Sequence, residues 1–125
     1  MLSRLRIPVV CSGRPLTPPD EPAVPYVDVD HLGGVAAAVR HLLRQGRRRI
    51  ATVAGPQDMV AGVDRLAGYR SALQEAGLPE RIEAGDFTRD SGVRAMHRLL
   101  AADPGLDAVF VASDMMAHGL SLIHI

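Results

Sequence analysis

A strand without polar alternation, closed by a tight turn and followed by a helix, limits what this chain can fold into more than any other feature. Residues 50–54 are apolar apart from Thr52, and Gly55-Pro56 ends the run. Strands of this kind are buried on both faces in parallel sheets that helices cover on both sides. Arg65 lies near the start of the following helix. Ligands of open α/β sheets bind beyond the carboxyl ends of the strands, so this pattern indicates a binding site rather than a catalytic one.

Strands and helices alternate along the rest of the chain. The predicted segments are strands at 7–11, 50–54, 81–87 and 107–112, a brief extended segment at 26–29, and helices at 31–45, 61–76 and 90–102, with a last helix that begins within 113–119. The strand at 7–11 is rich in β-branched residues and is expected to be buried. Asp30 is the expected N-terminal cap of the first helix, and Gly77 the C-terminal cap of the second. The alternation predicts an α/β fold with a parallel sheet flanked by helices.

The segment 14–25 interrupts this alternation. It holds five prolines in twelve residues, which cannot donate backbone hydrogen bonds and disfavour helix at the residues before them. We therefore predict a loop there, and it is the one place where the chain can cross between two lobes.

Size and charge narrow the possible classes of protein. The chain has 125 residues and a formal net charge of zero, which fits about one domain and gives this segment no electrostatic attraction for nucleic acid. Its single cysteine, Cys11, excludes an internal disulfide and fits a reducing compartment. No run approaches the roughly 18 apolar residues of a membrane span. We expect a cytoplasmic protein without a membrane partner.

Signatures of catalysis and of metal or cofactor binding are missing from the sequence. There is no Gly-x-Ser-x-Gly elbow, no Gly-Lys-Ser/Thr phosphate loop and no Gly-x-Gly-x-x-Gly after a strand. The five histidines show no metal-ligand spacing, so solvated or helix-capping roles are the expectation for His31, His41, His97, His118 and His124. We predict no enzyme activity, no metal and no cofactor.

Three side chains near predicted strand ends are candidates for ligand contact. Arg65 is either solvated, as most helical arginines are, or presents donors to hydroxyls or a carboxylate. Phe87 either belongs to the core or stacks on a sugar ring or base. Ser113 can donate a hydroxyl hydrogen to a ligand, whereas Asp114 is expected to cap the next helix. These residues predict a small-molecule crevice and do not name the molecule.

An ordered set of short motifs narrows the choice further. The motifs are Ile7-Pro8-Val9-Val10, Asp28-x-Asp30, Gly33-Gly34, His41-Leu42, Gly46-Arg47-Arg48-Arg49-Ile50-Ala51, Ala54-Gly55-Pro56, Arg65-Leu66-Ala67-Gly68-Tyr69, Ala76-Gly77-Leu78, Gly85-Asp86-Phe87 and Asp107-Ala108-Val109-Phe110-x-Ala112-Ser113-Asp114. Each is weak alone, but their order is specific. From Ile7 to about Gly119 the chain resembles the sensor domain of the lac-repressor/galactose-repressor family of bacterial transcription regulators.

The resemblance implies a fold and a set of site residues. The fold is the type I periplasmic-binding-protein-like one, with two α/β lobes and a small effector, a sugar or sometimes a nucleobase, in the cleft between them. The residue matching Arg65 contacts the effector, the one matching Phe87 packs on it, and the one matching Ser113 lies in the pocket.

At other matched positions, the resemblance implies residues that differ among members of the family. Met59 and Ala61 match pocket residues of variable identity. Gly13 stands where several members carry an effector-binding aspartate, and Ser113 stands where asparagine is common. The polar contacts of the best-known sugar sensors therefore do not transfer directly to this chain.

The implied function is effector sensing by a DNA-binding regulator, usually a repressor. Operator DNA would be bound through a helix-turn-helix that lies outside this chain, and the full-length protein would be a homodimer. The alternative is a periplasmic sugar-binding protein of a transporter, which shares the fold. We interpret residues 1–119 as an incomplete sensor domain, mostly its C-terminal lobe, with the lobe crossover near 14–30, and residues 120–125 as a non-native tail.

Overall fold

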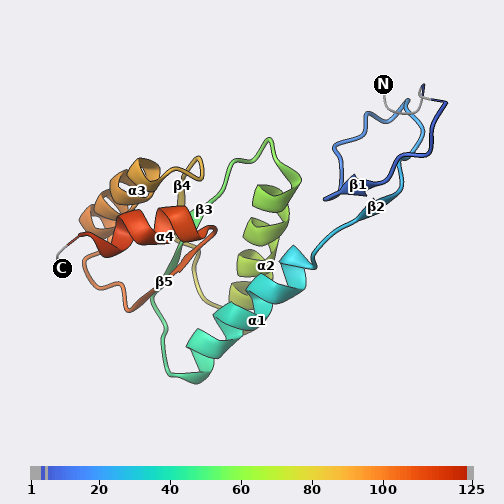
Figure 1. Ribbon diagram of the computed structural model, residues 1–125. Coiled ribbons are helices and arrows are strands. Elements are labelled where there is room, and N and C mark those ends of the chain that lie inside the picture. The colour runs from blue at the N-terminus through green and yellow to red at the C-terminus, as the bar shows by residue number, and fades with distance from the viewer. Residues whose placement is uncertain (1–3, 5, 124–125) are drawn as a thin grey trace.

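The computed structural model describes residues 4 and 6–123. It contains a small pair of strands followed by a three-layer α/β body (Figure 1). The elements are β1 (Cys11–Ser12), β2 (Tyr26–Val27), α1 (His31–Arg44), β3 (Ile50–Ala54), α2 (Val60–Ala76), β4 (Ile82–Ala84), α3 (Arg89–Ala102), β5 (Ala108–Val111) and α4 (Asp114–Ser121). The predicted alternation of strands and helices is confirmed.

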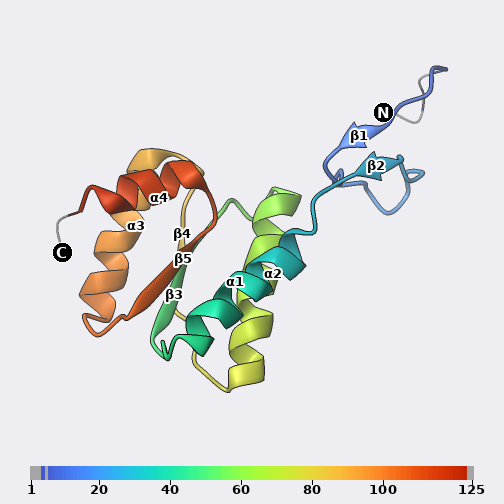
Figure 2. The ribbon, with the colours of Figure 1, turned by 60° about the horizontal axis from the view of Figure 1, so that its bottom comes forward.

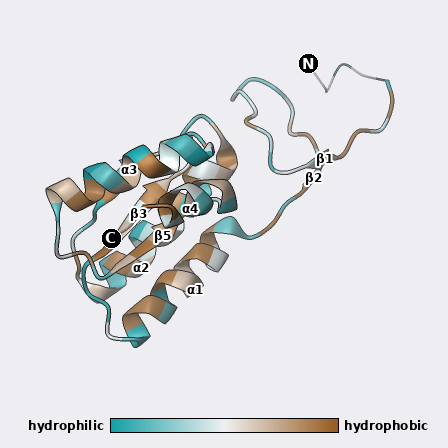
Figure 3. Ribbon diagram, turned by 60° about the vertical axis from the view of Figure 1, so that its left-hand side comes forward, coloured by the Kyte–Doolittle hydropathy of each residue, from teal (hydrophilic) through white to brown (hydrophobic). Residues whose placement is uncertain are grey.

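The body is built on a parallel sheet in the order β4-β3-β5. Helices α1 and α2 cover one face and α3 and α4 the other (Figure 2). All five residues of β3 are buried, as the apolar run predicts, because alternate side chains enter the two cores. Ile50 and Ala54 pack with α1 and α2, whereas Ala51 and Val53 pack with α3 and α4. Figure 3 shows β3 and β5 as hydrophobic strands between the helices.

Tyr69 is the largest fully buried side chain in the described part of the chain. Its hydroxyl donates to the carbonyl of Ile50 at 2.8 Å and accepts from the backbone N–H of Arg81 at 3.0 Å. One side chain of α2 thus binds backbone groups at the start of β3 and just before β4.

The strand pair β1–β2 stands apart from this body (Figures 1 and 2). The strands are parallel, with Cys11 opposite Tyr26 and Ser12 opposite Val27. The prediction of a buried strand over 7–11 was wrong: within that range only Cys11 is in a strand, and Ile7 and Val10 are each 66% exposed. No helix or further strand of the described chain covers this pair, so Ile7 and Val10 stay exposed.

The helix caps follow the prediction in two cases and differ in a third. The Asp30 carboxylate accepts from Gly33 N–H at 2.9 Å, and Gly77 closes α2 with a φ of 67°. Asp114 was expected to cap the last helix, but the cap is Ser113, whose hydroxyl oxygen accepts from Met116 N–H at 3.3 Å. Asp114 is the first residue of the helix instead, where its charge favours the helix dipole.

Two structural features are absent from the described residues, a membrane-spanning helix and a metal-binding cluster. Within residues 4 and 6–123, no helix has the length and apolar character needed to cross a membrane. In the same part of the chain, no three histidine, cysteine, aspartate or glutamate side chains gather closely enough to hold a metal ion.

Candidate functional site

The carboxyl ends of the three parallel strands meet at one edge of the sheet. The segments that leave this edge are Gly55 after β3, residues 85–87 after β4 and Ala112-Ser113 after β5. Helix α2 begins at the same edge. Side chains from distant parts of the sequence therefore come together here, as expected for an open α/β sheet.

Arg65 lies at the centre of this edge. Its Nη1 donates to the carbonyl of Ala112 at 2.5 Å, and its Nε donates to Nδ1 of His31 at 3.3 Å. Its Cζ lies 5.8 Å from the centroid of the Phe87 ring, within cation–π range. Nη2 has no hydrogen-bond partner among the residues that the structure describes. The guanidinium is thus oriented and still has donors available for a ligand.

Phe87 lies beside Arg65 in an unusual backbone conformation. Its φ is 70°, the one positive value among the described residues other than glycine, which costs roughly 1–3 kcal/mol. The ring packs so closely on Gly55 that a Cβ there would lie 2.5 Å from it. It also contacts the core between α3, α4 and the sheet. The partly buried ring thus packs on the core, which is the first of the two interpretations, and also lies beside the guanidinium.

The turn that holds Phe87 is fixed by Asp86. Its carboxylate accepts from the hydroxyl of Thr88 and from Thr88 N–H at 2.9 Å, and Thr88 in turn caps α3. The hydrogen bonds from Thr88, with a further one from Ser91, lower the pKa of Asp86 to about 2. The carboxylate is therefore ionised over the whole neutral and mildly acidic range.

Asp86 gives a prediction on the pH dependence of stability. A carboxyl group whose folded pKa is depressed stabilises the fold above its ordinary pKa of 3.8 and loses that contribution as the pH falls to about 2. We expect Asp86→Asn to lower the melting temperature near neutral pH. The difference in melting temperature from wild type is expected to shrink as the pH falls from 3.8 to about 2. Circular dichroism melts of both proteins across the acidic range measure it. A constant difference down to the lower value would contradict it.

A cavity of about 330 Å³ lies between the strand pair β1–β2, with the residues that follow it, and the start of α2. Its lining residues are Cys11, Ser12, Gly13, Arg14, Pro15, Asp28, His31, Met59, Val60 and Ala61. Three predicted site residues, Gly13, Met59 and Ala61, therefore share one cavity. The other three, Arg65, Phe87 and Ser113, lie at the sheet edge.

His31 joins the cavity to the sheet edge, a position that its sequence context did not predict. It lines the cavity and accepts the hydrogen bond from Arg65 Nε, whereas a solvated or capping role was expected. Its side chain is only 14% exposed. The available signals were its place directly after the cap Asp30 and three residues after Asp28, and neither reveals a contact with another helix.

Arg14 connects the segment that follows β1 to helix α2. Its Nη2 lies 2.7 Å from both carboxylate oxygens of Asp64, and its backbone N–H donates to Asp28 at 3.1 Å. That N–H, with the N–H of Val29 and the neighbouring His31, lowers the pKa of Asp28 below its ordinary value. These contacts hold the cavity wall against the helix.

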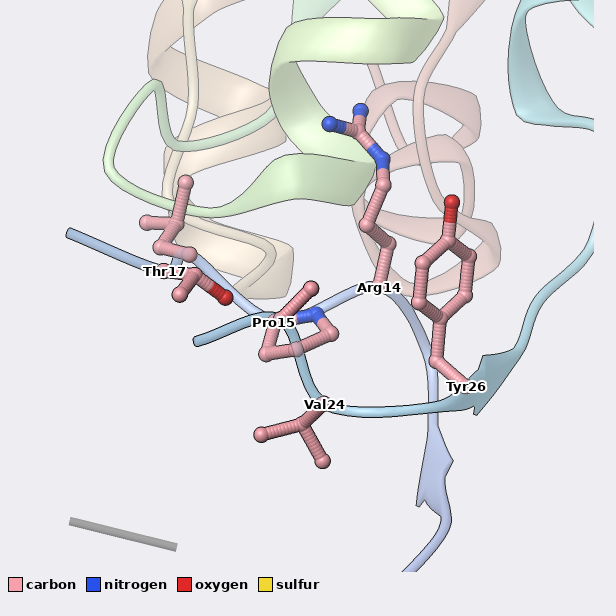
Figure 4. A pocket seen from close by; sticks show the side chains of 7 residues that line it. Arg14, Pro15, Thr17, Val24 and Tyr26 are labelled. Carbon is pink, nitrogen blue, oxygen red and sulfur yellow. The ribbon is translucent and has the colours of Figure 1, made fainter. Parts of the chain in front are cut away.

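A second cavity, of about 320 Å³, lies within the proline-rich loop. Figure 4 shows Pro15, Thr17, Val24 and Tyr26 around it, with the Arg14 side chain extending toward α2. The guanidinium of Arg14 is already paired with Asp64. This cavity therefore offers a ligand few free charged groups, and we assign it no role.

A parallel sheet with helices on both faces and oriented polar groups at its carboxyl edge defines a ligand-binding α/β lobe. Residues 39–122 match a family model described as a periplasmic binding protein-like domain. The chain belongs to this family and, within it, to the lac-repressor/galactose-repressor family of transcription regulators. The expected fold class is confirmed.

Two curated relatives illustrate the match. The chain is 52% identical to the HTH-type transcriptional regulator CelR of Thermobifida fusca, over 100% of this chain and 37% of that protein. It is 41% identical to the HTH-type transcriptional repressor CytR of Escherichia coli (strain K12), over 77% of this chain and 29% of that protein. The chain thus spans about a third of the length of these relatives.

Solved structures agree with these relatives. The complex of the transcriptional regulator CelR with cellobiose superimposes with a TM-score of 0.82 at 54% identity, covering 90% of this chain and 36% of that one. A regulatory protein of the LacI family from Chloroflexus aggregans has a TM-score of 0.80 at 37% identity, covering 91% and 41%.

Proposed function

We propose that this chain is the effector-sensing part of a bacterial transcription regulator and that its effector is a glucose disaccharide of the cellobiose type. The observation that carries the proposal is the likeness to CelR, at 52% identity along the whole chain, together with the structure of CelR bound to cellobiose. The named relatives are regulators, so the transporter alternative is not favoured.

The chemistry of the sheet edge supports a sugar. Sugars present hydroxyl groups around their rim and C–H groups on their ring faces. Arg65 has free donors at Nη2, and the partly buried Phe87 ring provides an apolar surface beside them. The Ser113 hydroxyl accepts the Met116 N–H through its oxygen, so its hydrogen remains available for donation. We propose Arg65, Phe87 and Ser113 as effector contacts at the sheet edge.

The cavity residues complete the proposed site. Gly13, Met59 and Ala61 line the space between the crossover segment and α2, where a second sugar ring can extend from the sheet edge. Met59 is 47% exposed, as expected for a residue that contacts a ligand rather than the core. Gly13 has a φ of 89°, so a residue with a side chain is disfavoured there.

We propose no catalytic activity for this site. A nucleophilic serine needs a base within hydrogen-bond reach. No histidine or carboxylate hydrogen bonds to the Ser113 hydroxyl within the described residues. The named relatives are transcription regulators.

The organisation of the whole regulator is part of the proposal. Residues 1–119 would form an incomplete sensor domain with the lobe crossover near 14–30, and residues 120–125 a non-native tail. Operator DNA would be bound in the cytoplasm by a homodimer, through a helix-turn-helix outside this chain. Effector binding would shift the population between lobe arrangements in proportion to its differential affinity for them, and so change operator binding.

The test is a titration of the intact regulator with cellobiose. We expect saturable binding by calorimetry with one sugar per chain, and binding of glucose that is weaker. We also expect cellobiose to lower the affinity for a palindromic operator in fluorescence anisotropy, since a symmetric dimer reads two half-sites. A protein that binds neither sugar, while an intact fold is seen by circular dichroism, would contradict the proposal.

A further inference from the structure

We infer that His31 is a positioning residue for Arg65: its imidazole holds the guanidinium at the sheet edge and ties it to Asp28 in the crossover segment. The inference rests on the proposed function, because it concerns how the effector contact is oriented. Neither the sequence nor the family resemblance assigns this histidine a role.

One contact at each ring nitrogen holds the imidazole of His31 in place. Nδ1 accepts from Arg65 Nε at 3.3 Å, and Nε2 lies 3.2 Å from Oδ1 of Asp28. Nδ1 is therefore the acceptor in this contact, and Nε2 faces the Asp28 carboxylate. The side chains of His31 and Asp28 are only 14% and 17% exposed. The ring is thus held from both sides, by Arg65 and by Asp28.

Asp28 is a firm anchor for this ring. Its Oδ1 also accepts from Val29 N–H at 2.7 Å, and its Oδ2 accepts from Arg14 N–H at 3.1 Å. Arg14 and Val29 each lie two residues beyond the end of a strand, β1 and β2 respectively. The orientation of Arg65 therefore depends on the geometry of the segment that we propose leads to the other lobe.

Arg65 is oriented without an ion pair to a carboxylate among the described residues. An arginine side chain loses rotamer entropy when it is fixed, so its orientation in advance of binding favours the complex. A carboxylate would fix it as well but would neutralise its charge. The neighbouring carboxylate, Asp64, is paired with Arg14 instead. Within the described residues, the Arg65 guanidinium donates to His31 and to the Ala112 carbonyl and lies beside the Phe87 ring.

The test compares two substitutions of similar size in the intact regulator. Asparagine can place its amide oxygen where Nδ1 of His31 lies, whereas leucine offers no acceptor. We expect His31→Leu to weaken cellobiose binding about tenfold, which is about 1.4 kcal/mol, and His31→Asn to stay within about threefold of wild type. His41→Leu, at an exposed position of the same helix, is the control and leaves binding unchanged. His31→Ala, which removes the acceptor and introduces the residue of highest helix propensity, repeats the leucine result should that variant not fold.

A double-mutant cycle separates positioning from a merely structural role. Lysine lacks the guanidinium Nε–H that donates to His31. In the Arg65→Lys background, the loss of cellobiose affinity caused by His31→Leu is therefore expected to fall to less than about twofold. An equal loss in both backgrounds, or an equal loss with leucine and asparagine, overturns the role of His31. If the wild-type regulator binds cellobiose and His31→Leu binds it as tightly, that role alone is overturned. If the wild type binds neither cellobiose nor glucose, the proposed function fails and this inference with it.

Discussion

Replacing Arg65 with alanine is expected to weaken cellobiose binding by the intact regulator at least about a hundredfold, or about 2.8 kcal/mol. Hydrogen bonds to a charged group contribute about 1.5–3 kcal/mol each, and Nη2 has two N–H groups without a partner within the described chain. The substitution also removes the cation beside Phe87 and leaves the Ala112 carbonyl without its donor. Calorimetric titration with cellobiose measures the loss.

Two further variants show whether the loss is specific to the planar fork of donors. Arg70 lies on the same helix, is 48% exposed and pairs with Glu80, so Arg70→Ala is expected to bind cellobiose as wild type does. Arg65→Lys keeps the charge and loses the fork, so its affinity is expected to fall between those of wild type and Arg65→Ala. An Arg65→Ala protein that folds and binds cellobiose normally would remove Arg65 from the proposed site.

The sequence alone predicted the position of Arg65 and Phe87 because both depend on chain direction. In a parallel sheet every carboxyl end lies at the same edge, so a residue that follows a strand can be placed without knowledge of side-chain packing. The apolar run at 50–54 was enough to predict a strand covered on both faces, and all five residues are buried. The roles of Arg65, Phe87 and Ser113 toward an effector remain proposals.

His31 could not be predicted in this way because its contact depends on how two helices pack. Helix α1 approaches α2 closely at Gly68, where a Cβ would lie 2.4 Å from the carbonyl oxygen of Leu32. This approach brings the first residue of α1 beside Arg65 on α2. Hydrophobic periodicity identifies the buried face of a helix but not the residue of another helix that it meets.

Two other differences have local causes. Residues 7–11 have the composition of a buried strand, but burial is a property of the neighbours, and in the described chain β1 pairs only with β2. Ser113 and Asp114 are both good caps, so the sequence does not decide between them. The backbone does: Ser113 is extended, with φ −150° and ψ 156°, and Asp114 already belongs to the helix.

Tyr69→Ala is expected to have the largest effect on stability, lowering the free energy of unfolding by about 3–5 kcal/mol. The ring is 0% exposed and packs among the residues of α1, α2 and β3. Burial raises the pKa of the Tyr69 hydroxyl, so it remains a donor to Ile50 well above neutral pH. Because a domain is stable by only about 5–15 kcal/mol, the loss is expected to leave the lobe partly unfolded at moderate temperature.

Tyr69→Phe separates the packing of the ring from its hydrogen bonds. The ring stays, but the carbonyl of Ile50 and the N–H of Arg81 lose their partner, which costs about 1–3 kcal/mol when the groups are buried. Tyr26, at 49% exposed, provides the control: Tyr26→Ala is expected to change the unfolding free energy by less than about 0.5 kcal/mol. Urea unfolding of the three variants, followed by circular dichroism, ranks them. Equal effects of Tyr69→Ala and Tyr26→Ala would mean that Tyr69 does not hold α2 to the sheet, because the exposed tyrosine makes no comparable contacts with the core.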